Sequence, residues 1–350
     1  MSQGNNLSEI PLSVLDLAPV RQGGTIADAL HNSRDLAQHA ERWGYKRFWL
    51  AEHHNIPGIA SAATSVLIGY VAEGTSTIRV GSGGVMLPNH APLVIAEQFG
   101  TLATLYPGRI DLGLGRAPGT DAPTMRALRR DMDGADDFPE LVAELRTLLG
   151  EPRRGQFVHA IPGEETNVPI WLLGSSGFSA QLAGMLGLPF AFAAHFQPDN
   201  LMPALELYRG SFQPSEVLER PYAMVAVPVV AAETDEQARF IASSMYLSFL
   251  NLIRNHPQPV MPPVANVEGL ANPLERPAVQ SKLRALIVGG PETVRRDLKK
   301  LLQETQADEL MIASNAYDHP DRLRSYEIVA HAAGKEGSVE NPELVDNLKI

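Results

Sequence analysis

The stretch Phe48-Trp49-Leu50-Ala51-Glu52-His53-His54 joins four apolar residues directly to three titratable ones. A short, unbroken apolar run predicts a strand that is buried on both faces, as in a parallel sheet covered by helices. The carboxylate and the two imidazoles then lie at the carboxyl end of this strand, where α/β sheets and barrels bind their ligands. Because side chains alternate along a strand, we expect Glu52 and His54 to point one way and His53 the other.

Strand and helix patterns alternate on both sides of this stretch. Eight segments have the length and apolar composition of buried strands: 10–17, 46–51, 78–84, 110–115, 169–174, 189–194, 222–231 and 308–313. Helical patterns separate them, at about 25–44, 61–73, 92–105, 139–149, 178–186, 200–212, 235–254 and 291–303, and a last one covers 320–333. This order predicts an α/β fold, a single (β/α)8 TIM barrel of parallel strands.

The chain is longer than such a barrel requires. A typical barrel needs roughly 250 residues, whereas this chain has 350. No shift in composition marks a second domain, so we expect one domain over 1–350, with 335–350 as a loose tail. The surplus lies mainly in insertions after the fourth and seventh strands and before the fifth. Because long loops after strands lie over the mouth of a barrel, we expect 117–137 and 255–285 to supply a lid.

Composition and charge exclude several kinds of protein. The 29 Lys and Arg residues against 40 Asp and Glu residues give a net charge of −11. An acidic chain without a basic block argues against nucleic acid or an anionic membrane as a partner. The absence of cysteine excludes disulfides, thiolate metal sites and cysteine nucleophiles. No signal peptide and no membrane span can be recognised, so we expect a soluble, cytoplasmic protein.

The titratable residues after the second strand admit two interpretations. One is a strand end whose imidazoles are satisfied by backbone groups. The other is a functional site, which we favour because three titratable groups follow a buried strand and histidine suits general acid–base chemistry near neutral pH. A metal site at Glu52 and His54 is a weaker interpretation, because adjacent histidines on a strand diverge and no other pair has metal-site spacing.

Two glycine-containing turns follow later strands. Gly174-Ser175-Ser176-Gly177-Phe178-Ser179 combines hydroxyls with the backbone N–H groups of a helix start, which can hold a phosphate. Simple capping of the helix by a serine is the competing interpretation. Gly81-Ser82-Gly83-Gly84 ends the third strand, where glycines allow either a flat ligand to approach or a bend at the barrel rim. Arg116, after the fourth strand, can pair with a phosphate or take part in a surface salt bridge.

Taken together, these stretches resemble the bacterial luciferase-like, flavin-dependent monooxygenase family, and within it the YhbW-type subgroup. The matching pieces lie at 49–54, 81–88, 107–113, 174–179 and 289–292, so the resemblance covers nearly the whole chain. It implies a TIM barrel that uses reduced FMN and O2 to insert one oxygen atom into a small organic substrate. It also implies a separate flavin reductase and a homodimer formed through helices 61–73 and 92–105.

The resemblance assigns roles to individual residues. His53 matches the family histidine beside the flavin that assists proton transfer, and Glu52 is its neighbour and our second catalytic candidate. Gly83 and Gly84 match a non-prolyl cis peptide under the isoalloxazine ring. Arg116, Ser176 and Ser179 match phosphate-contacting positions. Gly174, Ser175 and Gly177, which belong to the same turn, complete the cofactor-binding candidates.

This chain departs from the family pattern at two positions. Gly115 stands where true luciferases carry a reactive cysteine, which argues against light emission and long-chain aldehyde substrates. A second phosphate-binding arginine is replaced near Asp136, which argues against tight retention of the flavin; Arg126, Arg129 and Arg130 are candidates to take its place. The alternatives are an oxidoreductase that uses the deazaflavin F420 on the same barrel, a non-catalytic flavin-binding barrel, and a metal-dependent barrel hydrolase using Glu52 and His54.

Overall fold

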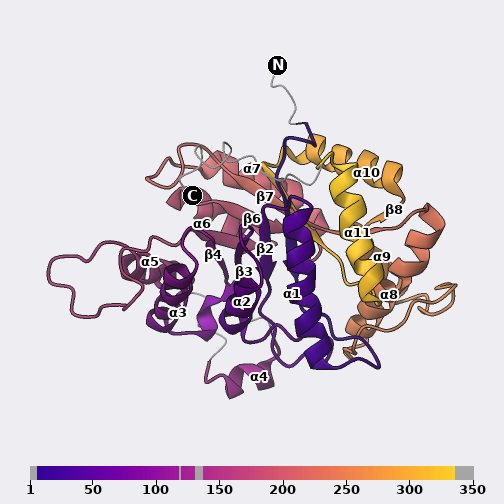
Figure 1. Ribbon diagram of the computed structural model, residues 1–350, viewed down its shortest axis with the longest axis horizontal. Helices are drawn as coiled ribbons and strands as arrows, with labels where there is room; N and C mark the ends of the chain where they lie inside the picture. Colours follow the sequence, from indigo (N-terminus) through magenta and orange to yellow (C-terminus); the bar gives the residue numbers. More distant parts are fainter. Residues whose placement is uncertain (1–5, 118–119, 131–136, 336–350) are drawn as a thin grey trace.

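Strands and helices alternate along the chain (Figure 1), in a computed structural model that describes residues 6–117, 120–130 and 137–335. The strands are β1 Leu12–Asp16, β2 Arg47–Leu50, β3 Arg79–Met86, β4 Ile110–Gly115, β5 Ile170–Gly174, β6 Phe190–Ala193, β7 Ala223–Ala231, β8 Ile287–Gly289 and β9 Glu309–Ala313. The α-helices are α1 Ile26–Arg42, α2 Thr64–Glu73, α3 Pro92–Leu105, α4 Ala122–Ala127, α5 Phe138–Leu149, α6 Gly177–Leu186, α7 Leu201–Ser211, α8 Asp235–Ile253, α9 Arg276–Leu283, α10 Pro291–Thr305 and α11 His319–Ala332. Short 3-10 helices are η1 Leu87–Asn89 and η3 Pro198–Asn200.

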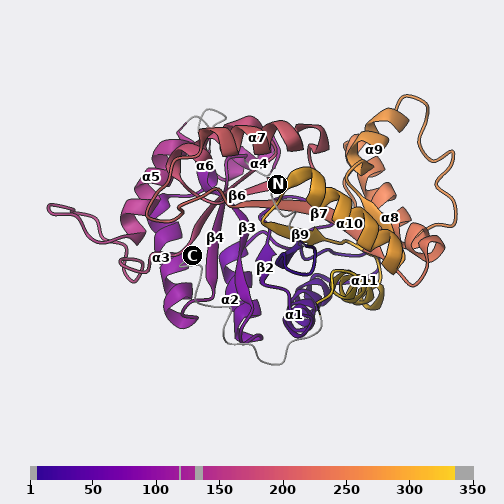
Figure 2. The ribbon, with the colours of Figure 1, turned by 90° about the horizontal axis from the view of Figure 1, so that it is seen from above.

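Eight of these strands close into a ring. Strands β1 to β6 pair in sequence order, β6 pairs with β7, and β9 joins β7 to β1, all in parallel. Seen from above, the helices surround the strands (Figure 2). The predicted TIM barrel is therefore confirmed, and each predicted barrel strand overlaps an observed one.

Besides the two 3-10 helices, three short elements were not predicted from the sequence. Strand β8 pairs with β7 alone, at Val229 to Ala231, beyond the stretch of β7 that lies in the ring. Its three residues are too few to show a periodic pattern. Helices α4 and α9 lie inside the insertions that follow β4 and β7, where the sequence predicted irregular chain. The predicted tail, apart from Lys335, lies outside the described residues.

The barrel interior is filled by side chains that alternate along the strands. Its largest members are Trp49 and Trp171, whose rings meet edge to face with centroids 5.2 Å apart. Methionines and alanines of β6, β7 and β9 complete this inner cluster. The alternate residues of the same strands, such as Phe48 and Leu172, face outward into the larger core beneath the helices. This two-sided burial explains why the strands read as continuous apolar runs.

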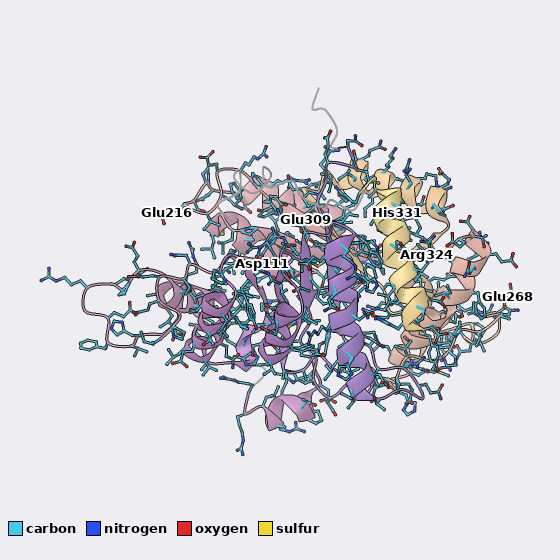
Figure 3. All side chains as sticks on the ribbon, in the orientation of Figure 1. Asp111, Glu216, Glu268, Glu309, Arg324 and His331 are labelled. Atoms are coloured by element: carbon cyan, nitrogen blue, oxygen red, sulfur yellow. The ribbon has the colours of Figure 1, made fainter. Side chains whose placement is uncertain are left out.

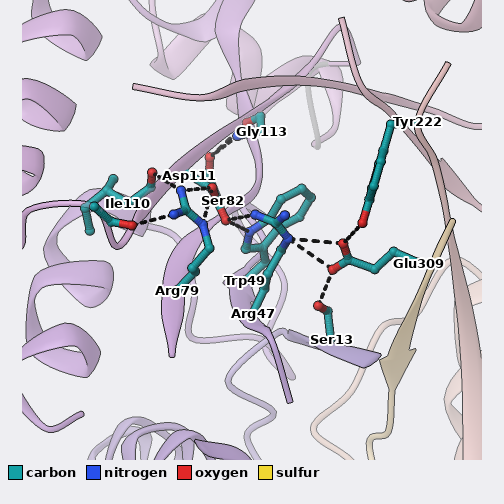
Figure 4. A network of polar contacts seen from close by, with 11 residues as sticks. Ser13, Arg47, Trp49, Arg79, Ser82, Ile110, Asp111, Gly113, Tyr222 and Glu309 are labelled. Atoms are coloured by element: carbon teal, nitrogen blue, oxygen red, sulfur yellow. Dashed lines mark hydrogen bonds and ion pairs between the residues drawn. The ribbon is translucent and has the colours of Figure 1, made fainter. Parts of the chain in front are cut away.

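A network of charged side chains closes the amino-terminal end of the barrel (Figure 4). Arg47 donates to Glu309 at 3.0 Å and to Asp111 at 2.7 Å, and Arg79 donates to the other oxygen of Asp111. Tyr222 donates to Glu309 at 2.8 Å. Asp111 and Glu309 lie in the interior, whereas Glu216, Glu268, Arg324 and His331 lie on the outside (Figure 3).

The insertion after β7 reaches the opposite end of the barrel. Val260 forms a bridge with Arg21 in the loop after β1, and its N–H donates to the Val20 carbonyl at 2.8 Å. The insertion therefore lies beside the mouth formed by the carboxyl ends of the strands, as expected for a lid. Across the described ranges, no helix combines the length and apolar character needed to cross a membrane.

Candidate active site

Glu52, His53 and His54 follow β2 after a single residue, Ala51, at the carboxyl-terminal mouth of the barrel. The Nε2 atom of His54 lies 2.8 Å from Oε1 of Glu52, so these two side chains lie on the same side of the chain, as the alternation predicted. The serine turn follows β5, and Gly83 and Gly84 lie in the carboxyl-terminal half of β3, so both lie toward this same mouth. The residues predicted from the sequence are thus gathered at one end of the barrel.

Glu52 is buried and fully engaged by its neighbours. Its carboxylate contacts Nε2 of His54 and Nε2 of His90, and it accepts a hydrogen bond from the backbone N–H of Met86 at 3.0 Å. Burial opposes ionisation, but the hydrogen bonds from His54, His90 and Met86 outweigh it and lower the pKa of Glu52 to about 2. This geometry anchors the end of β3 and the following turn to β2. The catalytic role of Glu52 stays a prediction.

Replacing Glu52 by glutamine is expected to change the acid sensitivity of the fold. The pKa of Glu52 falls from 4.5 to about 2 on folding, which corresponds to about 3 kcal/mol. Since the folded-state pKa is the lower one, ionised Glu52 stabilises the protein above pH 4.5, and this contribution disappears as the pH falls toward 2. Urea denaturation between pH 2 and pH 4.5 should show that the free energy of unfolding depends less steeply on pH in Glu52→Gln than in the wild type. Equal pH dependences in the two proteins would contradict the lowered pKa of Glu52. Glu216→Gln, a substitution of an exposed glutamate, is the control and should behave as the wild type does.

His53 lies beside two residues that the sequence did not single out. The Phe196 ring contacts the His53 ring edge-on with centroids 6.4 Å apart, and the His195 ring lies 4.3 Å from Phe196. Burial lowers the pKa of His195 to about 4, and His53 and Lys282 add to this effect. The Nδ1 atom of His195 is buried without a hydrogen-bond partner in the described structure. A second imidazole, neutral at pH 7, therefore lies near His53; its position just after β6 was the available sequence signal.

The glycine stretch of β3 leaves no room for side chains. The Gly83–Gly84 peptide bond is cis, as the family resemblance implied. A Cβ on Gly83 would lie 2.6 Å from Leu15, and one on Gly84 would lie 2.7 Å from the carbonyl oxygen of Gly113. The rim-bend and flat-ligand interpretations both fit this close packing. The space beside Gly115 is filled by the Met86 side chain, whose sulfur would lie 2.9 Å from a Cβ at that position.

The serine turn and Arg116 come together at the amino terminus of α6. Ser176 occupies the N-cap position, but its side chain accepts no hydrogen bond from the helix, which argues against simple capping as its role. The guanidinium of Arg116 lies 4.2 Å from the centroid of the Phe178 ring, in the first turn of α6. The first N–H groups of a helix and a nearby arginine form an anion site. Ser179 is buried against Gly174 behind this turn.

The other sequence predictions for this region have different outcomes. Within the described residues, no group of three or more His, Asp or Glu side chains could hold a metal ion. Glu52 and His54, the pair considered for a metal hydrolase, contact each other, and Glu52 also contacts His90. Asp136, the second departure from the family pattern, lies outside the described residues, and so does part of the 117–137 lid segment. Its described part, 120–130, contains α4 and is tied to the mouth where Thr120 donates to the His54 carbonyl at 3.1 Å.

Two curated relatives match almost the whole chain. A protein named YvbT from Bacillus subtilis is 60% identical over 329 residues, which cover 93% of this chain and 97% of the relative. A protein from Escherichia coli K12 named luciferase-like monooxygenase is 54% identical over 320 residues, covering 91% and 96%.

Solved structures show the same fold. Apo-MsnO8 superimposes with a TM-score of 0.87 at 38% identity, covering 94% of this chain and all of MsnO8. The oxygenating constituent of 3,6-diketocamphane monooxygenase from Pseudomonas putida, a type II Baeyer–Villiger monooxygenase solved in complex with FMN, superimposes with a TM-score of 0.71 at 17% identity, covering 95% and 99%. The model of the luciferase-like monooxygenase family matches residues 11–309. The chain therefore belongs to the luciferase-like monooxygenase family and is an oxidoreductase of the monooxygenase type.

Proposed function

We propose that this protein is an FMN-dependent monooxygenase that uses reduced FMN and O2 to oxygenate a small organic substrate. The observation that carries the proposal is the gathering of His53, the Gly83–Gly84 floor and the Ser176 turn at one mouth of the barrel. When bound, reduced FMN supplies the electrons that activate O2. A neighbour of the same fold holds FMN, which supports a flavin as the cofactor.

The described residues fit such a cofactor. The cap serine of α6 leaves the first N–H groups of the helix available for phosphate, and Arg116 lies over Phe178 beside them. Gly83 and Gly84 provide a flat surface where side chains would collide with the barrel. In the mechanism, these groups bind and orient the flavin, and His53 holds or moves a proton beside its ring. The inner cluster around Trp49 and Trp171 closes the barrel beneath and keeps water out from below.

Ser176→Asp tests the phosphate pocket, with riboflavin as the phosphate-free ligand. A carboxylate at this position repels the phosphate and removes a hydroxyl donor, so the dissociation constant of FMN should rise about 10- to 100-fold, the equivalent of about 1.4–2.7 kcal/mol. Binding of riboflavin should change much less. Flavin fluorescence quenching gives both constants.

The same experiment separates the proposal from its failures. Ser8→Asp, on the exposed chain before β1, is the control and should leave FMN binding unchanged. Equal losses for FMN and riboflavin would place the phosphate elsewhere. No binding of FMN by the wild type would reject the proposed cofactor, and displacement of FMN by F420 would favour the deazaflavin alternative. Oxygen consumption that does not depend on His53 would favour a flavin-binding barrel without catalysis.

The assembly and the cellular context are also part of the proposal. Helices α2 and α3 carry exposed apolar side chains, among them Val66, Val94 and Leu105, which suit close packing against a second copy. We expect a homodimer in the cytoplasm, supplied with reduced FMN by a separate reductase. Sedimentation velocity at micromolar concentration should give the mass of a dimer, and a monomer would contradict this prediction. The YhbW-type subgroup likewise stays a prediction.

A further inference from the structure

The loop after β6, residues 194–200, lies between His53 and the insertion that follows β7. We propose that Phe196 is a positioning residue for His53, and that α9 holds Phe196 in place through Lys282 and Arg284. The inference rests on the proposed function, because it concerns the histidine assigned there to the flavin site. It adds a connection between the insertion and that histidine.

The contact between Phe196 and His53 is the first step. The two rings meet edge-on, with centroids 6.4 Å apart and planes inclined by 65°. The His195 ring packs on Phe196 at 4.3 Å. Phe196 is 44% exposed, so burial in the core does not fix its position. A ring that limits the rotamers of His53 therefore needs support from outside the barrel core.

Helix α9 supplies that support. The ammonium group of Lys282 donates a hydrogen bond to the backbone carbonyl of Phe196 at 3.1 Å. Arg284, which caps the carboxyl end of α9, forms an ion pair with Asp199 in η3. These two contacts hold the loop at the Phe196 carbonyl and at Asp199, three residues further along. They are the contacts that an opening of the insertion would break.

We call the contacts of Lys282 and Arg284 with the loop after β6 the latch. The insertion is also held by contacts outside the latch. Val279 of α9 packs with Leu250 of α8 and with Ala271. At its other end, Val260 pairs with the loop after β1. Loss of Lys282 and Arg284 would therefore remove the contacts between α9 and the loop after β6 and leave the rest of the insertion attached.

The same loop also contacts the predicted phosphate turn. The side-chain amide of Asn200 donates to the carbonyl of Ser175 at 3.2 Å. One loop thus joins His53, the serine turn and α9. Docking of α9 on this loop would hold His53 in position while the insertion lies over the mouth.

The double variant Lys282→Met/Arg284→Met tests the inference without flavin or substrate. In the flavin-free protein, the imidazole Cε1–H signal of His53 is identified by its absence in His53→Gln. The latch variant should broaden this signal about twofold or split it, because the ring then samples more than one rotamer. Lys299→Met, which removes an exposed lysine of α10, is the control and should leave the signal unchanged.

Two variants of Phe196 complete the test. Phe196→Leu should broaden the His53 signal as the latch variant does, whereas Phe196→Tyr keeps an aromatic edge and should preserve the narrow signal. An unchanged His53 signal in both the latch variant and Phe196→Leu would overturn the inference. Because no step uses FMN, failure of the wild type to bind FMN would reject the proposed cofactor and leave this result to be judged on its own.

Discussion

Replacing Arg47 by methionine is expected to lower the free energy of unfolding by about 3–5 kcal/mol, the largest effect on stability that we predict. Arg47 is buried and is the shared partner of two buried carboxylates, those of Asp111 and Glu309. Methionine fills a similar volume but leaves Glu309 without a guanidinium partner, and it leaves Asp111 with Arg79 and the indole N–H of Trp49. Buried charges without partners are expensive, so the cost comes mainly from the carboxylates that remain.

Urea denaturation at pH 7 measures this effect. Arg239→Met is the matched control, because its side chain is 69% exposed and its ion pair with Asp235 spans 3.7 Å; such a pair contributes about 0.2–0.5 kcal/mol. The triple variant Arg47→Met/Asp111→Asn/Glu309→Gln also removes the charges of the two carboxylates. It should recover part of the free energy of unfolding that Arg47→Met loses. A loss below about 1 kcal/mol for Arg47→Met would show that the network does not depend on this arginine.

Replacing Gly84 by alanine is expected to weaken FMN binding about 5- to 150-fold, the equivalent of about 1–3 kcal/mol of overpacking. The added methyl group would lie 2.7 Å from the carbonyl oxygen of Gly113. That carbonyl accepts a hydrogen bond from Ser82 at 2.9 Å, and the same hydroxyl accepts from the Gly113 N–H. The backbone of β4 is therefore held in place, and β3 has to move at the proposed floor of the flavin site.

Gly210→Ala is the control for this substitution. Gly210 lies in α7, and a Cβ there has no atom within 4 Å. It should bind FMN as the wild type does and gain slightly in stability, because alanine favours a helix over glycine. Fluorescence titration with FMN measures both variants. If Gly84→Ala binds FMN as tightly as the wild type, then Gly83 and Gly84 form a bend at the barrel rim and do not contact the flavin.

Much of the barrel could be predicted because buried parallel strands have a simple pattern. The run before Glu52 is apolar at every position, since one face of β2 packs inside the barrel and the other beneath the helices. The opposite orientations of Glu52 and His53 followed from strand alternation, and the Glu52–His54 contact agrees with it. Strand β8 was missed because three residues outside the ring carry no periodicity.

The side-chain networks could not be predicted in the same way. Arg47 and Glu309 are 262 positions apart, and only closure of the ring brings them together. His195 and Phe196 were missed for a related reason. A single titratable residue after β6 is a weak signal, and its proximity to His53 depends on the width of the barrel. The involvement of Lys282 required knowledge of where a long insertion returns to the mouth, which no local pattern provides.

A crystal structure of the protein with FMN tests the central claim most directly. The account predicts one FMN at the mouth, with its phosphate at the amino terminus of α6 near Ser176 and Arg116, and its ring over Gly83–Gly84 beside His53. An FMN molecule bound elsewhere, or one whose ring lies away from His53 while its phosphate occupies the serine turn, would contradict it.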